Sequence, residues 1–304
     1  MSKQRVIVTG GSGFIGSFLT ERLIRTGFDV IVLDRNPKPR QGARFVTCDI
    51  FTDWQILKEE IHTDDTVIHL ASTSVPGPGT GEDQRVEDAR DNIGGTISLL
   101  EICAAKRIRK FIFPSSGGTV YGNRGTRFHV EEETLAPQSS YGAVKAATEN
   151  YLGVFEHLYG LRHTILRISN PYGRKTMANK KLGAIDVFMR QAQERQRITV
   201  WGDGYQVRDY IYIEDVIDFF LLAIERAEVT GVYNVGTGVG ANLREILSVI
   251  SKVIGKDIDV VYGPGRVVDV KHNVLDISKA HCVGWRPKYA LREGILLTYV
   301  GIES

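Results

Sequence analysis

Six short apolar runs alternate with helical patterns through the first half of the chain. The runs are nearly continuous in valine, isoleucine, leucine and phenylalanine, which is the composition of strands that helices cover on both faces. Because parallel strands need a crossover connection, which a helix supplies, this alternation predicts an α/β fold with a doubly wound parallel sheet. The expected strands are residues 5–10, 29–34, 43–49, 66–72, 110–116 and 163–169, with helices at 14–26, 87–106 and 140–159.

The regular alternation fades after Asn170. A polar, basic segment at 174–181 precedes an expected helix at about 183–195, and short strands follow. Amphipathic helices are expected at 213–227 and 243–255, on either side of the buried strand "GVYNVG". We interpret this part as a smaller α/β lobe, with some segments returning to the first domain. The predicted division is 1–169 plus about 209–235 for the first domain, and about 170–208 plus 236–304 for the second.

Composition narrows the function classes. The 304 residues are 42% hydrophobic and 24% charged, and the net charge of +2 gives no reason to expect nucleic acid or an anionic membrane surface as a partner. We expect neither secretion nor membrane spanning, because the sequence has no signal-peptide pattern and no apolar run of about 18 residues. Cys48, Cys103 and Cys282 lie far apart, and the histidines are scattered, so we expect reduced thiols, a cytoplasmic protein and no metal site.

The turn between the first strand and the first helix is rich in glycine. In "VIVTGGSGFIGSFL", Gly11, Gly13 and Gly16 satisfy the pattern G-x-G-x-x-G, and Gly10, Gly13 and Gly16 satisfy G-x-x-G-x-x-G. A side chain at these positions would block the approach of the backbone to a pyrophosphate at the helix N-terminus. The rival phosphate loop requires G-K-[ST], which is absent. The loop therefore predicts a dinucleotide site.

Asp34 ends the second expected strand, where an acidic side chain can accept hydrogen bonds from the diol of an adenosine ribose. This position favours NAD over NADP. Arg35 beside it weakens the preference, because an arginine could pair with a 2′-phosphate.

Tyr141 and Lys145 lie four residues apart in "SSYGAVKAATENYL", so a helix would place them on one face. An ammonium group close to a phenol favours the phenolate and lowers the phenol's pKa, which would make Tyr141 a usable acid/base. The same spacing occurs in many ordinary helices, and here its meaning comes from the dinucleotide loop upstream.

With these motifs the chain resembles the extended short-chain dehydrogenase/reductase superfamily, and within it the nucleotide-sugar epimerases and dehydratases. The resemblance covers essentially the whole length. Its motifs stand in the family's order: "TGGSGFIG", "HLAS", "DNIGGTISLLE", "SSGGTVYG", "YGAVKAATE", "RISNPYG", "GDGYQVRDYIYIEDV" and "YNVGTG".

The resemblance implies a Rossmann sheet, bound NAD and a UDP-sugar substrate. It implies that Tyr141 is the catalytic acid/base and that Lys145 tunes it and binds the nicotinamide ribose. In the second lobe Asn170 matches a nucleotide-sugar contact, and Arg208 and Arg266 match arginines that bind the substrate diphosphate, although Asn170 could instead be a turn residue and Arg266 a solvated loop residue. The implied NAD contacts are Gly10, Gly13, Phe14, Ile15, Gly16, Asp34, Asp49, Ile50, Leu70, Ala71, Asn92, Tyr141 and Lys145.

The chain departs from the family in "SSGGTVYG". Relatives usually carry Ser or Thr where this chain has Gly117, to hydrogen-bond the reacting sugar oxygen. Thr119 is the favoured substitute, because residues 117 and 119 of an extended segment face the same way; Ser116 and a water molecule are the alternatives. Dehydratases place an Asp–Glu pair where this chain has Gly118 and Thr119, so dehydration is disfavoured.

The implied activity is NAD-dependent epimerisation at C4 of a UDP-hexose through a 4-keto intermediate. One alternative is an NADPH-dependent 4-keto-sugar nucleotide reductase, and another is a non-catalytic dinucleotide sensor. The sugar itself, of glucose, N-acetylglucosamine or glucuronate type, stays open. In relatives, helices matching 87–106 and 140–159 pair across a two-fold axis, which implies a homodimer.

Overall fold

The computed structural model describes residues 3–74, 82–123, 125, 128–173, 183–265 and 270–303. The chain forms two compact units. The first comprises Met1–Val120, Pro137–Arg167 and Ile217–Tyr233, and the second Tyr121–Ala136, Ile168–Val216 and Asn234–Ser304.

Among the described residues, seven strands form one sheet in the order β10-β6-β5-β4-β1-β2-β3. The neighbouring pairs from β3 to β5 are parallel. Strand order 3-2-1-4-5-6 is that of a Rossmann sheet, which confirms the predicted fold class. Each of the six predicted strands begins at the expected residue: β1 Arg5–Thr9, β2 Asp29–Asp34, β3 Ala43–Thr47, β4 Thr66–His69, β5 Lys110–Ser116 and β6 His163–Ile168; β10 is Gly231–Val235.

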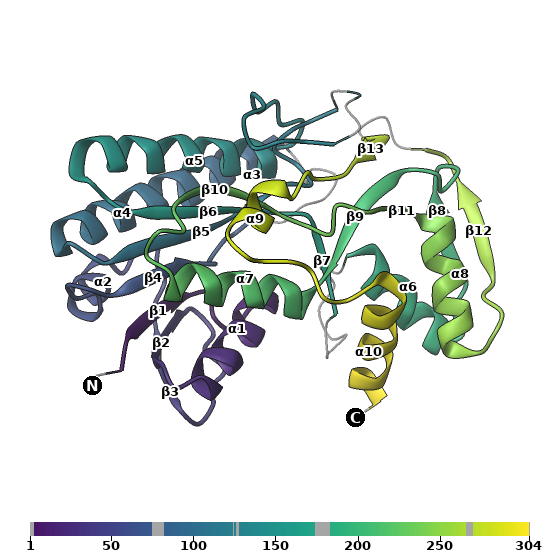
Figure 1. Ribbon diagram of the computed structural model, residues 1–304, viewed down its shortest axis with the longest axis horizontal. Coiled ribbons are helices and arrows are strands. Elements are labelled where there is room, and N and C mark those ends of the chain that lie inside the picture. Colours follow the sequence, from purple (N-terminus) through teal and green to yellow (C-terminus); the bar gives the residue numbers. More distant parts are fainter. Residues whose placement is uncertain are drawn as a thin grey trace. The chain divides into compact units, whose positions relative to one another are not determined.

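Helices cover both faces of this sheet. Figure 1 shows α4 (Gly95–Lys106) and α5 (Ser140–Tyr159) on one face, and α1 (Phe14–Arg25) and α7 (Ile213–Glu225) on the other. The core on the first face also takes in α2 (Trp54–Glu60). Its fully buried side chains include Ile7, Leu33, Leu57, Val67, Leu99, Phe111 and Leu152.

The predicted helix 140–159 is confirmed at both ends. The Ser139 hydroxyl caps its start by accepting from the backbone N–H of Gly142, and Gly160 ends it with a φ of +65°. The predicted helix 87–106 is interrupted. The segment consists of α3 (Glu82–Asp88), a π-helical stretch Ala89–Gly94 and then α4.

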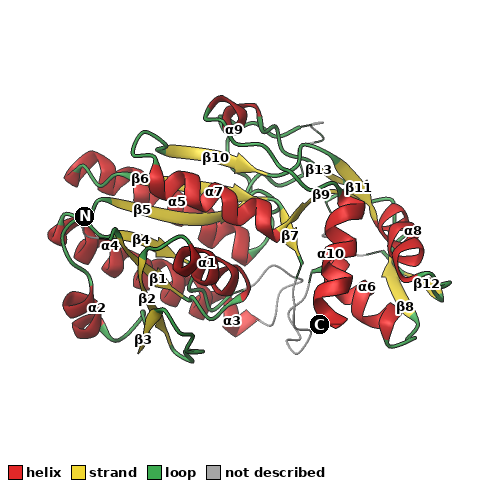
Figure 2. Cartoon of the chain, turned by 60° about the horizontal axis from the view of Figure 1, so that its bottom comes forward, coloured by secondary structure: helices red, strands yellow, loops and turns green. Residues whose placement is uncertain are grey.

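The second unit contains a four-stranded sheet and a two-stranded sheet. Figure 2 shows α6, α8 and α10 close together, and α8 packs against both of the other helices. The strands are β7 Asn170–Tyr172, β8 Ile198–Trp201, β9 Val207–Tyr212, β11 Gly240–Asn242, β12 Val260–Gly263 and β13 His272–Asn273. The helices are α6 Ala184–Gln193, α8 Leu243–Ile254, α9 Ser278–Cys282 and α10 Leu291–Glu303. The predicted basic segment 174–181 lies outside the described residues.

The units differ from the predicted division in four segments, 121–136, 168–169, 209–216 and 234–235, all of which belong to the second unit. The hydrogen bonds of Asn234 are one reason why the segment 121–136 belongs to the second unit. Its amide nitrogen donates to the His129 carbonyl at 2.8 Å, and its amide oxygen accepts from the Tyr121 hydroxyl at 2.6 Å. These contacts join residues more than 100 positions apart, so the sequence pattern could not reveal them.

No helix of the described chain is long and apolar enough to cross a membrane.

Candidate active site

The glycine loop allows two backbone segments to pass very close to each other. Gly10 has a φ of +69°, and a Cβ atom there would lie 2.6 Å from the backbone nitrogen of Ala71. A Cβ on Gly16 would lie 2.5 Å from the Gly10 carbonyl oxygen. Both positions therefore require glycine. Gly13 forms the N-cap of α1, and no described side chain caps this helix start, so its first N–H groups suit an anion.

Asp34 ties the end of β2 to the glycine loop. One carboxylate oxygen accepts from the Ser12 backbone N–H at 3.0 Å, and the other accepts from that of Asn36 at 2.9 Å. The Ser12 hydroxyl in turn accepts from the Lys38 backbone N–H at 3.0 Å. Each Asp34 oxygen keeps further lone-pair capacity, so the carboxylate is held in place and still able to accept from a ribose hydroxyl.

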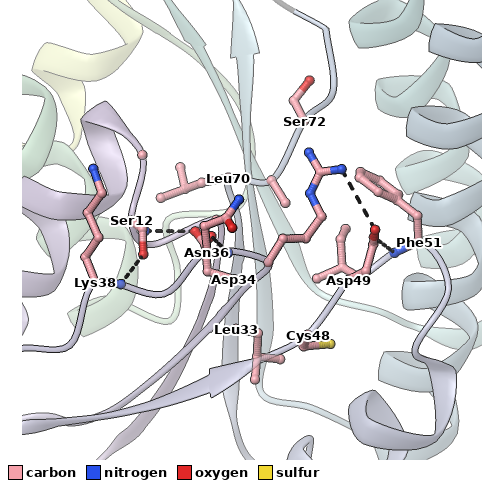
Figure 3. A pocket seen from close by; sticks show the side chains of 15 residues that line it. Ser12, Leu33, Asp34, Asn36, Lys38, Cys48, Asp49, Phe51, Leu70 and Ser72 are labelled. Carbon is pink, nitrogen blue, oxygen red and sulfur yellow. Dashed lines mark hydrogen bonds and ion pairs between the residues drawn. The ribbon is translucent and has the colours of Figure 1, made fainter. Parts of the chain in front are cut away.

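These segments border a cavity of about 290 Å³ within the first unit. Figure 3 shows Ser12, Asp34 and Asn36 on one side of it, opposite Asp49 and Phe51. Seven of the predicted cofactor residues line it together: Gly10, Gly13, Asp34, Asp49, Ile50, Leu70 and Ala71.

Several lining residues were not singled out for the site from the sequence, namely Ser12, Leu33, Asn36, Lys38, Cys48, Phe51 and Ser72. Most of them are next in sequence to a predicted site residue, near the carboxyl end of a strand of the sheet. Arg35, noted only for a possible phosphate, also lines the cavity, and its guanidinium lies 3.8 Å from the Asp49 carboxylate.

Phe14, Ile15, Gly16 and Asn92 do not line this cavity. Phe14 packs edge-to-face on Phe18 within α1, with ring centroids 5.9 Å apart.

Asn92 lies in the π-helical stretch and holds the segment that follows β4. Its amide oxygen accepts from the Thr73 backbone N–H at 2.9 Å and from the Ser72 hydroxyl at 3.1 Å. Its amide nitrogen donates to the Thr73 hydroxyl at 2.7 Å and to the Asp88 carbonyl at 2.8 Å. In this structure the carboxamide therefore supports the wall of the cavity through Ser72.

Tyr141 and Lys145 lie in the first two turns of α5, beside the end of β5. The Lys145 ammonium donates to the Pro114 carbonyl at 2.8 Å and lies 4.5 Å from the centre of the Phe113 ring. The Ser116 hydroxyl forms a hydrogen bond with the Tyr141 phenol. The structure thus brings Ser116, Tyr141 and Lys145 together at the carboxyl end of β5.

The pKa of Tyr141 differs from the expectation. Burial raises it to about 12, and the hydrogen bond with Ser116 acts in the opposite direction. The expected lowering of the Tyr141 pKa by the charge of Lys145 is not found. The lysine nitrogen, held by Pro114, lies 5.7 Å from the centre of the Tyr141 ring. Burial also lowers the pKa of Lys145 to about 8, opposed by the charge of Glu149.

The segment after β5 forms a tight turn. The Ser116 carbonyl accepts from the backbone N–H groups of Thr119 and Val120, at 3.1 and 3.0 Å. The Thr119 hydroxyl is buried and has no hydrogen-bond partner among the described residues. Because buried hydroxyls normally have a partner, this one is available to a ligand.

Of the three substrate residues predicted in the second lobe, two are described. Asn170 begins β7, and its amide nitrogen donates to the Asp209 carbonyl of β9 at 2.8 Å. Arg208 lies on β9, where its guanidinium donates to the Val207 carbonyl at 2.9 Å. Asn170 pairs in register with Tyr210, two residues from Arg208, so the structure places both on neighbouring strands. Arg266 lies outside the described residues.

These residues fit a dinucleotide. The Gly10–Ala71 approach leaves backbone exposed to a pyrophosphate, the start of α1 suits its charge, and Asp34 suits a ribose. The phenol–serine–lysine group, which lies at the carboxyl end of β5 and does not line this cavity, can move a proton.

Comparisons with known proteins agree with this chemistry. The model of the NAD dependent epimerase/dehydratase family matches residues 6–236. A UDP-glucose 4-epimerase of Mycolicibacterium smegmatis is 33% identical over 307 residues, 97% of each chain. A dTDP-4-dehydro-6-deoxyglucose reductase of Escherichia coli is 30% identical over 305 residues, 96% of each chain. Among solved structures, the UDP-glucose 4-epimerase of Thermus thermophilus in complex with NAD matches with a TM-score of 0.89 and 34% identity, over 99% of both chains.

Proposed function

The chain belongs to the NAD dependent epimerase/dehydratase family, and from that premise we propose that it inverts C4 of a UDP-hexose of the UDP-glucose or UDP-galactose type. The observation that carries the proposal is the group formed by Ser116, Tyr141 and Lys145 at the end of β5. The absence of an Asp–Glu pair at Gly118 and Thr119 favours epimerisation over dehydration.

Tyr141 is proposed to remove the proton of the sugar 4-hydroxyl and, after the 4-keto sugar has turned over in the site, to return a proton to the same oxygen. Bound NAD would supply the acceptor for the C4 hydride, the source from which that hydride returns to the opposite face of C4, and a positive charge that favours the phenolate. Lys145 donates one of its three N–H groups to Pro114, and we assign the others to the nicotinamide ribose.

The two units are proposed to divide the ligands. The first would bind NAD through the residues of the cavity, and the second would bind the nucleotide sugar through Asn170, Arg208 and Arg266. Arginine suits this role because its planar fork binds phosphate oxygens in pairs. The free thiols Cys48, Cys103 and Cys282 support the proposal that the protein works in the reducing cytoplasm.

Ser116 is proposed to take the part of the hydroxyl missing at Gly117, because it already bonds the Tyr141 phenol. Thr119 would then contact the sugar. We expect Ser116→Ala to lower kcat about 10-fold or more, as for loss of one hydrogen bond to a charged group. Thr119→Val should instead raise KM. A Ser116→Ala variant with normal kcat would exclude this assignment.

The reaction itself can be tested with a panel of UDP-glucose, UDP-N-acetylglucosamine and UDP-glucuronate, each incubated with the protein and NAD. Inversion at C4, followed by proton NMR, is the expected outcome for at least one of them. No inversion in any sample would count against the proposal.

A 4-keto-sugar nucleotide reductase is the second candidate, because one relative at 30% identity carries that name and Arg35 lines the cavity. It predicts consumption of NADPH in step with reduction of a supplied 4-keto sugar. Epimerisation without net consumption of a nicotinamide excludes it. Binding of NAD with no turnover of any sugar would instead indicate a sensor.

A further inference from the structure

Glu149 lies on the same face of α5 as Tyr141 and Lys145, at consecutive intervals of four residues. The three side chains therefore stack along the helix, with Lys145 in the middle. Glu149 is buried, and the reaction proposed above gives it no part.

Two strands hold the Glu149 carboxylate. From β6, the Nε of Arg167 donates to its two oxygens at 3.2 and 3.1 Å, and the Nη2 donates at 2.7 Å. From β5, the Ser115 hydroxyl donates to it. Both members of the Arg167–Glu149 ion pair are about 95% buried. These donors complement a negative charge on the carboxylate.

Lys145 lies in surroundings that oppose its charge. It is buried against the Phe113 ring, and burial of an ammonium ion favours the neutral amine. Two features favour the ammonium form instead. They are the hydrogen bond that Lys145 donates to the Pro114 carbonyl and the negative charge of Glu149.

We propose that the buried carboxylate of Glu149 keeps Lys145 in its ammonium form, the form that can donate both to Pro114 and to the nicotinamide ribose. The inference rests on the proposed function of that lysine. Glu149 is a positioning residue in this scheme, since it acts through Lys145. Arg167 and Ser115 hold the carboxylate in place, and Glu149 itself lies about one helical turn along α5 from Lys145.

Few other charged groups are present around this stack. From β4 the His69 imidazole feels the charge of Lys145, but it is neutral, with its pKa lowered to about 3 by burial and by that charge. From β6, His163 feels the charge of Glu149, and burial lowers its pKa. On the π-helical stretch Arg90 and Asp91 pair with each other at 2.8 Å.

The test uses Glu149→Gln, which removes the charge and keeps the volume. Glu156→Gln, an exposed position on the same helix, is the matched control. Since Glu149→Gln takes the carboxylate away from the buried Arg167, it should destabilise the protein. The double variant Glu149→Gln/Arg167→Met removes the Arg167 charge as well, and it is the variant to measure if the single variant does not fold.

The first measurement is the pKa of Lys145 itself, from the NMR signal of its ¹³C-labelled Cε, assigned with Lys145→Arg. We expect Glu149→Gln to lower it by about one pH unit, the double variant to lower it by less because the repulsion from Arg167 is removed as well, and Glu156→Gln to leave it unchanged. The alkaline limb of the kcat/KM profile should move to lower pH by the same amount.

An unchanged Lys145 pKa in the Glu149→Gln variants would overturn the inference and leave Glu149 a structural ion-pair partner. A lower melting temperature alone would have the same meaning. The NMR measurement needs no turnover. Failure of the wild type to epimerise any UDP-hexose would therefore overturn the proposed function, while the Lys145 pKa still decides the role of Glu149 in sustaining its charge.

Discussion

Gly10 is the residue at which the wall of the cavity tolerates the least change. We predict that Gly10→Ala lowers the free energy of unfolding by more than the roughly 1–2 kcal/mol that a left-handed backbone costs alanine, because the new Cβ would meet the Ala71 backbone at 2.6 Å. It should also weaken NAD binding, measured by calorimetry.

The control is Gly160→Ala at the end of α5. Gly160 has a similar φ of +65°, but a Cβ there would have no atom within 4 Å. We expect only the backbone cost and normal NAD binding. Equal losses at the two positions would contradict the close approach of Gly10 and Ala71.

Tyr141 is the residue on which the proposed chemistry depends. Tyr141→Phe removes the proton-carrying oxygen and little volume, so we expect kcat to fall by about 10²- to 10⁴-fold with NAD binding retained. Tyr159→Phe, on the exposed end of the same helix, should behave like the wild type. A Tyr141→Phe variant with most of its activity would exclude the mechanism.

Residue identities were enough to propose ligands for Asp34 and Asn92, but not to predict the hydrogen bonds that these side chains form. Asp34 was assigned to a ribose from its place after β2, and it lines the cavity, but its bonds to Ser12 and Asn36 depend on the path of the loops. Asn92 was assigned to the cofactor, and its amide instead holds Thr73 and Ser72. The bonds to Ser12, Thr73 and Ser72 join segments about 20 residues apart, which no local pattern encodes.

At the scale of elements, α5 carries a stripe of exposed apolar residues that suits the proposed homodimer. Tyr151, Val154 and Leu158 are 38%, 46% and 61% exposed and follow one another at helical spacing. We predict that Val154→Asp shifts the protein from dimer to monomer in light scattering, because a charge cannot be buried unpaired in an interface.

Val239→Asp is the control for this change, since Val239 is 68% exposed and lies outside α5. It should leave the oligomeric state unchanged. If the wild type is itself a monomer at micromolar concentration, this face of α5 is not a dimer interface.

The strands were predictable as elements because their apolar runs are flanked by polar residues, and all six begin where expected. The π-helical stretch Ala89–Gly94 was not, because the apolar spacing of a continuous α-helix runs through it. The short strands of the second unit escaped placement for a related reason: β13 has two residues and β11 has three, too few to show a period.

At the scale of the whole molecule, NAD should stabilise the fold by mass action. At about 100 times its Kd, a ligand that binds only the folded state adds about 2.7 kcal/mol, which corresponds to a rise in melting temperature of roughly 5 °C. At the same concentration NADP should give a smaller rise, because its 2′-phosphate would meet the Asp34 carboxylate. An equal rise would show that Arg35 outweighs Asp34.

The sequence by itself determined the parallel sheet, the dinucleotide loop and the Tyr141–Lys145 pair, because strand periodicity, glycine spacing and helical spacing are local properties of the chain. Only the tertiary structure decided which hydroxyl bonds Tyr141, which segments belong to each unit and how Glu149 meets Arg167. These depend on residues far apart in the chain, and burial sets the resulting pKa values. The pKa of Lys145, for example, is lowered because folding buries its ammonium group in surroundings of low polarity.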